Sequence, residues 1–337
     1  MAHIAAGSIH SVIVDHNASL WVCGGNKYGQ LGYFSLSKFK TKVKMLGDIP
    51  PVLSVTAGNC SSFFIDNENQ AWGFGSNIHG ELGLNKRWKA IYRPTKIKNP
   101  KKVKSVAFGY LHSLFLDEDG NVWSCGSNEQ GQLGLEDNLQ RKKPEKIEGL
   151  PPIKSVSCGY YFSTFLDING VIWTTGLDQP VFPPKAIMEL DRIREVSSDS
   201  YSSMFITEND NLILYDGQQN KTPIVADIPP VKQAGGSLDW AVFIDHEGSV
   251  WNARKQLSHN PYKPNQIAFS KNVRVEQTIG PLSEVAVGDS HIICTTPDGS
   301  VYTWKTTGSW PHVVNKLPGI VTSLQEQSNV KSARNVT

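Results

Sequence analysis

The sequence predicts an all-β protein folded as a seven-bladed β-propeller that is closed by its N- and C-terminal strands. A unit of 38–51 residues recurs about seven times between residues 1 and 324. Within each unit, short runs of alternating polar and apolar residues are separated by glycine-containing turns. One such unit is only marginally stable alone, and radial packing lets neighbouring units bury one another's faces.

The repeats align on one position near the start of each unit, which we call the anchor. It is glycine in five copies, and a bulky aromatic or aliphatic residue follows it fourteen positions later in every copy. The seven anchors are Gly7, Gly58, Gly109, Gly159, Asp199, Ser237 and Gly288. Seven aligned cores are far more than chance would produce.

The third copy shows how each element of the unit is predicted. Residues 112–117 alternate in polarity, as a half-buried strand does, and residues 121–125 form the returning strand. Asp117 and Gly120 predict the hairpin turn between them, because Asp accepts backbone N–H groups and Gly adopts positive φ. After a glycine-rich turn, a strand led by Pro144 precedes the next copy.

The first three copies differ from the later ones in a G-Q-L-G or G-E-L-G segment, which the later copies lack. We expect its leucines, Leu31, Leu82 and Leu133, to fill equivalent gaps between blades. Spacings of 40 and 38 residues follow the fourth and fifth anchors, so we expect one face to be lower there. The first three blades would then form a rigid, raised rim that faces a partner. Simple decay of redundant loops is the alternative.

The two ends of the repeat array complement each other, which favours a closed ring over a linear solenoid. The first copy lacks a proline-led strand, and residues 311–320 resemble one, so we expect them to supply the outer strand of the first blade. Residues 2–6 and 320–324 both match one inner-strand position, and the sequence leaves open which occupies it. Residues 325–337 are polar and aperiodic, which predicts a tail or linker stump after a propeller domain of residues 1–324.

The repeat resembles that of the regulator of chromosome condensation family. The resemblance rests on G-x-x-H-S, D-x-x-G-x-V-W and G-x-N-x-x-G-Q-L-G, which residues 109–134 match almost throughout and residues 7–32 nearly as well. It implies a seven-bladed propeller, a fold that serves many roles. The family's founding member is a nucleotide-exchange factor for the small GTPase Ran and also binds nucleosomes.

Two functions follow from the resemblance. The first is a non-enzymatic protein-interaction propeller, acting as a scaffold, adaptor or regulator. The alternative is a guanine-nucleotide exchange factor for a Ran-like small GTPase. The sequence has no basic N-terminal tail, no long insertion that would act as an exchange wedge, and no G-W-R-H-T motif of the plant photoreceptor. These departures favour the first function.

Composition narrows the function classes further. A formal net charge of +2 disfavours nucleic acid or chromatin as the partner, and no apolar run is long enough to predict a membrane span. The five cysteines are scattered and never paired as C-x-x-C, so we expect reduced thiols in the cytoplasm or nucleus. No catalytic, cofactor-binding or metal-binding motif is present, so the sequence predicts that the chain is not an enzyme and binds no cofactor.

Two groups of residues are candidates for a special role. Histidine occupies one repeat position in three copies, at His10, His112 and His291, where a repeated structural hydrogen bond is favoured over a metal site. A basic segment follows the second copy, and its candidate partner-binding residues are Lys86, Arg87, Trp88, Lys89 and Arg93. A solvated sheet edge is the alternative for this segment. The repeated tryptophans are expected in the core: Trp21, Trp72, Trp123, Trp173 and Trp251.

Overall fold

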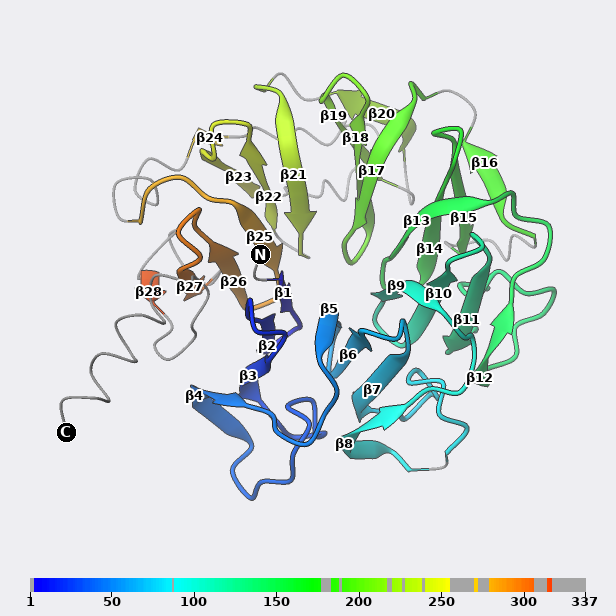
Figure 1. The fold of residues 1–337 in the computed structure, drawn as a ribbon. Coiled ribbons are helices and arrows are strands. Elements are labelled where there is room, and N and C mark those ends of the chain that lie inside the picture. Colours follow the sequence, from blue (N-terminus) through cyan, green and yellow to red (C-terminus); the bar gives the residue numbers. More distant parts are fainter. Residues whose placement is uncertain are drawn as a thin grey trace.

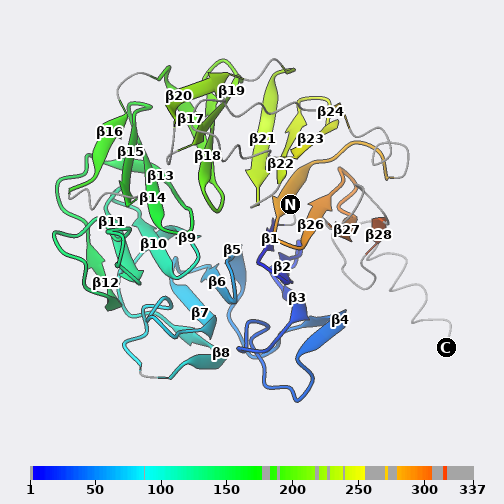
Figure 2. The ribbon, with the colours of Figure 1, turned by 180° about the vertical axis from the view of Figure 1, so that it is seen from behind.

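Seven four-stranded antiparallel sheets form a ring around a central axis in the computed structural model (Figure 1), which confirms the seven-bladed propeller. The second view, from behind, shows the same closed ring (Figure 2). The structure describes residues 3–86, 88–176, 183–187, 190–216, 220–225, 228–237, 240–254, 270–271, 279–305 and 314–316.

Each blade is made of four strands that follow one another in the chain, from the inner strand at the axis to the outer strand at the rim. Blades 1 to 3 comprise β1 (His3–Ala6), β2 (His10–Val14), β3 (Leu20–Gly25), β4 (Phe39–Met45); β5 (Val52–Ala57), β6 (Ser61–Asp66), β7 (Ala71–Ser76), β8 (Ala90–Lys96); β9 (Val103–Phe108), β10 (His112–Asp117), β11 (Val122–Gly126) and β12 (Arg141–Lys146). Blades 4 and 5 comprise β13 (Ile153–Cys158), β14 (Phe162–Asp167), β15 (Ile172–Gly176), β16 (Lys185–Ile187); β17 (Ile193–Ser198), β18 (Ser202–Thr207), β19 (Leu212–Asp216) and β20 (Asn220–Val225). Blades 6 and 7 comprise β21 (Val231–Gly236), β22 (Trp240–Asp245), β23 (Val250–Arg254), β24 (Ser270–Lys271); β25 (Glu284–Val287), β26 (His291–Thr295), β27 (Val301–Lys305) and β28 (Val314–Lys316).

The prediction that residues 311–320 complete the first blade was wrong. β28 pairs with β27 as the outer strand of blade 7, and β4 is the outer strand of blade 1, with Trp21 opposite Met45. Residues 39–45 form this strand without a proline, so blade 1 needs no strand from the C-terminus. β1 fills the inner-strand position of blade 1. Its rival, residues 320–324, and the predicted tail lie outside the described residues.

The ring is closed by contact between whole blades. β1 packs against β25 and β26 of blade 7, and these strands lie side by side in both ribbon views. Ile4 and Ile13 of blade 1 join one buried cluster with Ile293 of blade 7. The Ser290 hydroxyl donates a 2.7 Å hydrogen bond to the Ser8 carbonyl across the same junction. The N-terminal and C-terminal blades therefore close the ring by side-chain packing and hydrogen bonds.

The three leucines of the G-Q-L-G segments fill the gaps between blades, as predicted. Leu31, Leu82 and Leu133 are fully buried. Each belongs to a cluster that joins apolar side chains of its own blade with those of the next blade. Dense contacts of this kind account for much of the stability of a propeller whose single blades are marginal.

The repeated tryptophans are half-buried, and each packs against a buried core cluster, as predicted. In five blades the indole N–H donates to an aspartate six residues earlier, at 2.7–3.2 Å. The pairs are Asp15–Trp21, Asp66–Trp72, Asp117–Trp123, Asp167–Trp173 and Asp245–Trp251. The other carboxylate oxygen of Asp117 accepts the N–H groups of Asp119 and Asn121, so one aspartate fixes both the hairpin turn and the indole.

Candidate protein-interaction face

The two faces of the ring carry different connections. One face, the anchor face, carries the anchors and the connections between third and fourth strands. Backbone hydrogen bonds join these two kinds of connection, as between Gly25 N–H and the Ile9 carbonyl at 2.8 Å. The opposite face, the hairpin face, carries the D-x-x-G turns and the links between blades, joined for example by Val103 N–H and the Asn69 carbonyl at 2.7 Å.

The three repeat-position histidines lie at three separate blade junctions and do not meet at the axis. Each Nε2 lies 2.7–3.0 Å from a serine hydroxyl of the next blade. The pairs are His10–Ser62, His112–Ser163 and His291–Ser11. The third of these pairs spans the junction at which the ring closes.

The tautomer of two of these histidines follows from their serine partners. The Ser62 hydroxyl donates to the Gln30 carbonyl, and the Ser163 hydroxyl donates to the Gln132 carbonyl. Each hydroxyl therefore accepts from a histidine Nε2–H. Burial lowers the pKa of His10 and His112 to about 3 and that of His291 to about 4, so all three imidazoles are neutral at neutral pH.

Exposed apolar side chains gather on the anchor face of blades 1 to 4. Of the eleven exposed large hydrophobic residues in the described chain, seven lie in connections of this face: Ile9, Phe34, Leu36, Ile78, Trp88, Leu139 and Tyr161. Leu36 is 92% exposed and Trp88 is 64% exposed. A face with this many exposed apolar side chains is typical of a protein-binding surface.

The predicted partner-binding residues are partly brought together on this face. The Lys86 ammonium lies 4.8 Å from the centre of the Trp88 ring, and the Asn77 side chain donates to the carbonyls of both residues. Lys89 is exposed in the same connection. Arg93 is exposed on β8 and lines a groove between blades 1 and 2. Arg87 lies outside the described residues.

The connections and outer strands of blades 1 and 2 are strongly basic. Residues 26–45 contain five lysines and no acidic residue, and residues 77–98 contain six basic residues and one acidic residue, Glu81. Glu81 is buried and accepts a 2.6 Å hydrogen bond from the Ser76 hydroxyl. The exposed charge on the connections and outer strands of blades 1 and 2 is therefore positive.

A cavity of about 130 Å³ opens at the axis of the anchor face, and the anchors of all seven blades line it. Tyr110, Tyr160 and Tyr201 follow the anchors of blades 3 to 5 and form a continuous aromatic arc, with ring centres 4.5 Å and 5.3 Å apart. Asp199 and Asp289 also line the cavity. Sequence reasoning missed this site, although a tyrosine close after the anchor in three successive copies was a signal.

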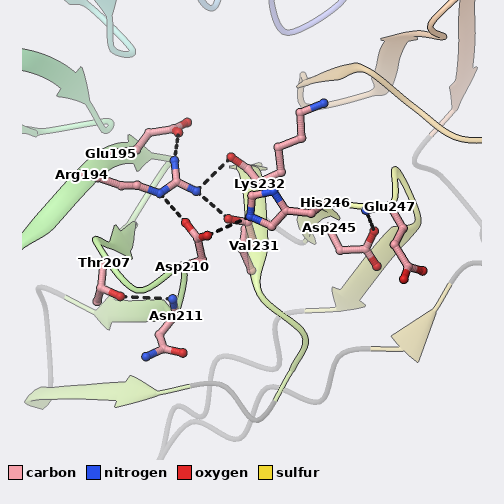
Figure 3. A network of polar contacts seen from close by, with 10 residues as sticks. All are labelled: Arg194, Glu195, Thr207, Asp210, Asn211, Val231, Lys232, Asp245, His246 and Glu247. Carbon is pink, nitrogen blue, oxygen red and sulfur yellow. Dashed lines mark hydrogen bonds and ion pairs between the residues drawn. The ribbon is translucent and has the colours of Figure 1, made fainter.

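A polar network on the hairpin face joins the short blade 5 to blade 6 (Figure 3). Asp210 binds the Arg194 guanidinium at 2.7 Å and the His246 ring at 2.8 Å, and Arg194 also donates to the Val231 carbonyl at 2.6 Å. These side chains bind one another, so the network holds blades 5 and 6 together. No repeat pattern pointed to it.

Burial raises the pKa of all five cysteine thiols. All five cysteines are free thiols, and burial raises the pKa of the Cys23 thiol to about 11, so it is not a thiolate at neutral pH. No group of three histidine, cysteine or acidic side chains in the described ranges is placed to hold a metal ion. Within the same ranges, no helix is long and apolar enough to cross a membrane.

Comparison with known proteins identifies the repeat. A family model described as the regulator of chromosome condensation (RCC1) repeat matches residues 68–116 and 119–166, and a second model of that description matches residues 103–132. Each long match begins in the hairpin turn of one blade and ends in the second strand of the next. The sequence repeat is therefore offset from the structural blade.

One relative matches most of this chain but is a much longer protein. The chain is 28% identical over 322 residues to the X-linked retinitis pigmentosa GTPase regulator homolog of Caenorhabditis elegans, which covers 89% of this chain and 19% of that protein. The chain therefore spans about a fifth of the length of this curated relative.

Solved structures show the same fold. Human WBSCR16 superposes with a TM-score of 0.75 at 18% identity, covering 87% of this chain and 86% of that one. Yeast RCC1 (Prp20), seen bound to Kap60, gives a TM-score of 0.71 at 18% identity, covering 85% and 78%. Prp20p of Saccharomyces cerevisiae has also been described with its binding properties to Gsp1p and histones. At these identities the likeness shows the fold alone.

Proposed function

Because the chain is a divergent member of the regulator of chromosome condensation repeat family, we propose that it is a non-enzymatic protein-interaction propeller. It would act as a scaffold, adaptor or regulator in the cytoplasm or nucleus. The family fold alone does not decide this, since one propeller supports unrelated functions. The argument therefore rests on the surface of this chain.

The observation that carries the proposal is the anchor-face rim, defined here as the third-to-fourth-strand connections of blades 1 and 2 (residues 26–38 and 77–89). It presents exposed apolar side chains such as Phe34, Leu36 and Trp88 among lysines. Large apolar side chains surrounded by charge are the composition of interaction hot spots with a polar border. An acidic protein surface with apolar side chains is the partner that this rim fits.

The lengths of the connections between third and fourth strands support placing the partner on blades 1 and 2 rather than on blades 4 and 5. The corresponding segments are residues 177–184 in blade 4 and 217–219 in blade 5, which are shorter than those of the rim. Asn26 and Asn77 hold the bases of the two rim connections by accepting the N–H groups of Leu31 and Leu82 at 3.0 Å and 3.1 Å. The rim connections are therefore longer than those of blades 4 and 5 and are internally braced, as a preformed binding surface requires.

Charge reversal on the rim tests the proposal. In the triple variant Lys86→Glu, Arg87→Glu, Lys89→Glu, we expect recovery of the bound partner in affinity purification to fall about tenfold or more. Thermal stability should hardly change, because exposed charges contribute little to folding. The matched control is Lys98→Glu, Lys101→Glu, Lys154→Glu, three exposed lysines of the hairpin side. Equal partner recovery from both triple variants would remove the rim as the binding surface.

The second candidate function is guanine-nucleotide exchange on a Ran-like small GTPase. It is favoured by the relative that spans 89% of this chain and is named a GTPase regulator, and by the yeast propeller described with Gsp1p. Release of fluorescent GDP from purified Ran discriminates the two functions. We expect the release rate to stay at its spontaneous value. A strong acceleration of GDP release would mean that the chain is an exchange factor rather than a scaffold.

A further inference from the structure

The cavity at the axis has the opposite charge to the rim around it. Asp199 and Asp289 line it, and none of the described lining residues is lysine, arginine or histidine. Tyr110 and Tyr160 line it from blades 3 and 4. We propose that this cavity binds the guanidinium group of an arginine side chain, which a partner protein inserts along the axis of the ring.

The aromatic arc provides the surface on which a guanidinium group stacks. The rings of Tyr110 and Tyr160 are tilted by 33° at 4.5 Å, and Tyr161 meets Tyr160 edge to face at 6.1 Å. Together with Tyr201 they cover the axial ends of blades 3 to 5. A planar, weakly hydrated guanidinium stacks on such rings more favourably than the compact ammonium of lysine does, and aromatic rings attract cations.

One of the two carboxylates stands where five of the other blades have glycine. Asp199 is the anchor of blade 5 and is only 7% exposed. Its carboxylate accepts the N–H groups of Tyr201 and Ser202, both at 3.2 Å, and the Ser202 hydroxyl at 2.8 Å. These bonds fix a negative charge beside the cavity that Gly109 and Gly159 cannot provide at the equivalent positions.

The second carboxylate, Asp289 of blade 7, is exposed to the cavity and follows the anchor Gly288. Desolvation raises its pKa above the ordinary value, and repulsion from Asp199 raises it further, while a hydrogen bond from Ser8 opposes both. A cation between the two carboxylates would relieve their repulsion. The site is therefore electrostatically prepared for a positive group.

The size of the cavity limits its ligand. A volume of about 130 Å³ admits the end of one side chain but no helix or strand. The inference rests on the proposed function only in assigning the arginine to a partner protein. A partner with an acidic surface around one protruding arginine would match both the basic rim and the acidic centre.

Binding of a free arginine derivative tests the site without the partner. N-acetyl-arginine methylamide is titrated into the full chain carrying carbon-13 tyrosine, and the tyrosine ring resonances are followed by NMR. We expect saturable shifts of the Tyr110 and Tyr160 signals. The citrulline derivative, which has nearly the same shape without the charge, should produce none.

Variants of the chain test which residues bind the arginine derivative. Asp289→Asn should weaken arginine binding about tenfold or more, because a charge-assisted contact is lost. Asp119→Asn, an exposed aspartate on the hairpin face, is the matched control and should bind as the unchanged protein does. The rim triple variant should also retain arginine binding, so failure of the rim and failure of the cavity are distinguishable. Equal shifts with citrulline, equal binding of the lysine derivative, or unchanged affinity in Asp289→Asn would each overturn the proposal.

Discussion

Replacing Leu82 by alanine is expected to lower the free energy of unfolding by about 2–5 kcal/mol, the range for large-to-alanine changes in tightly packed cores. Leu82 is fully buried between blades 2 and 3. Its cluster contains Phe63 of blade 2 together with Val106 and Phe115 of blade 3. Strands on both sides hold this site, so the neighbours cannot collapse into the cavity that the substitution leaves.

Urea unfolding followed by tryptophan fluorescence measures this effect. The control is Leu139→Ala, which removes the same atoms from a leucine that is 66% exposed in an anchor-face connection. Its free energy of unfolding should change by no more than about 0.5 kcal/mol. A loss at Leu82 as small as that at Leu139 would mean that the G-Q-L-G leucine does not join the blades.

Acidification is expected to destabilise the ring by several kcal/mol in total, through the three histidines at the blade junctions. Burial holds the pKa of His10 and His112 at about 3 and that of His291 at about 4, against 6.5 in an exposed histidine. Below pH 6.5 the unfolded chain therefore binds more protons than the folded chain. The free energy of unfolding should fall from there down to about pH 3–4.

The partly buried carboxyl group of Glu284 opposes this trend. Burial raises the pKa of Glu284 from 4.5 to about 7, so this carboxyl takes up its proton first in the folded state. Its contribution to stability grows as the pH falls from 7 to 4.5. Glu284→Gln should therefore steepen the loss of stability over that window.

Urea unfolding at a series of pH values separates these contributions. His112→Gln should reduce the slope of stability against pH by up to about 1.4 kcal/mol per pH unit, the value for one proton. His79→Gln serves as control, because His79 is only half-buried. If His112→Gln and the unchanged protein gave parallel pH profiles, the junction histidines would not govern acid stability.

The fold was predictable because its determinants recur. Gly58 and Gly109 are required for a reason that the structure makes explicit: a Cβ on Gly58 would lie 1.6 Å from the Phe108 ring, and one on Gly109 would lie 2.4 Å from the Gly159 carbonyl oxygen. Leu31, Leu82 and Leu133 were placed between blades on the same grounds. A constraint repeated at a fixed period is visible in one sequence.

The closure of the ring was mispredicted because the sequence repeat and the blade have different starting points. The repeat matched at residues 68–116 runs from the turn of blade 2 into β10 of blade 3. Counting each unit from its anchor likewise leaves β1, the inner strand of blade 1, outside the first unit. The outer strand of blade 1 therefore seemed to be missing. The pairing of β3 with β4 depends on residues 39–45, whose lysine-rich sequence lacks the proline of other outer strands.

The candidate sites were harder to predict because they depend on contacts between blades. His291 meets Ser11 across 280 positions of sequence, and no local pattern shows that distance. The aspartate–tryptophan hydrogen bond could have been predicted, since both residues recur six positions apart in five copies. Both are absent together in blade 5, with Thr207 and Ile213, and in blade 7, with Thr296 and Tyr302.

In the described residues each blade takes its four strands from one stretch of chain, and this has a consequence for how the chain can be rearranged. Consecutive blades are linked from an outer strand to the next inner strand, for example by residues 46–51, 97–102 and 147–152. Blade 7 ends its sheet at Lys316 on the outside, and blade 1 begins at His3 on the inside. At the junction of blade 7 with blade 1, β1 packs against β25 and β26, just as β5 packs against β1 and β2 at the first junction. Any blade can serve as the first, and circular permutants opened in any of these links would encode the same ring.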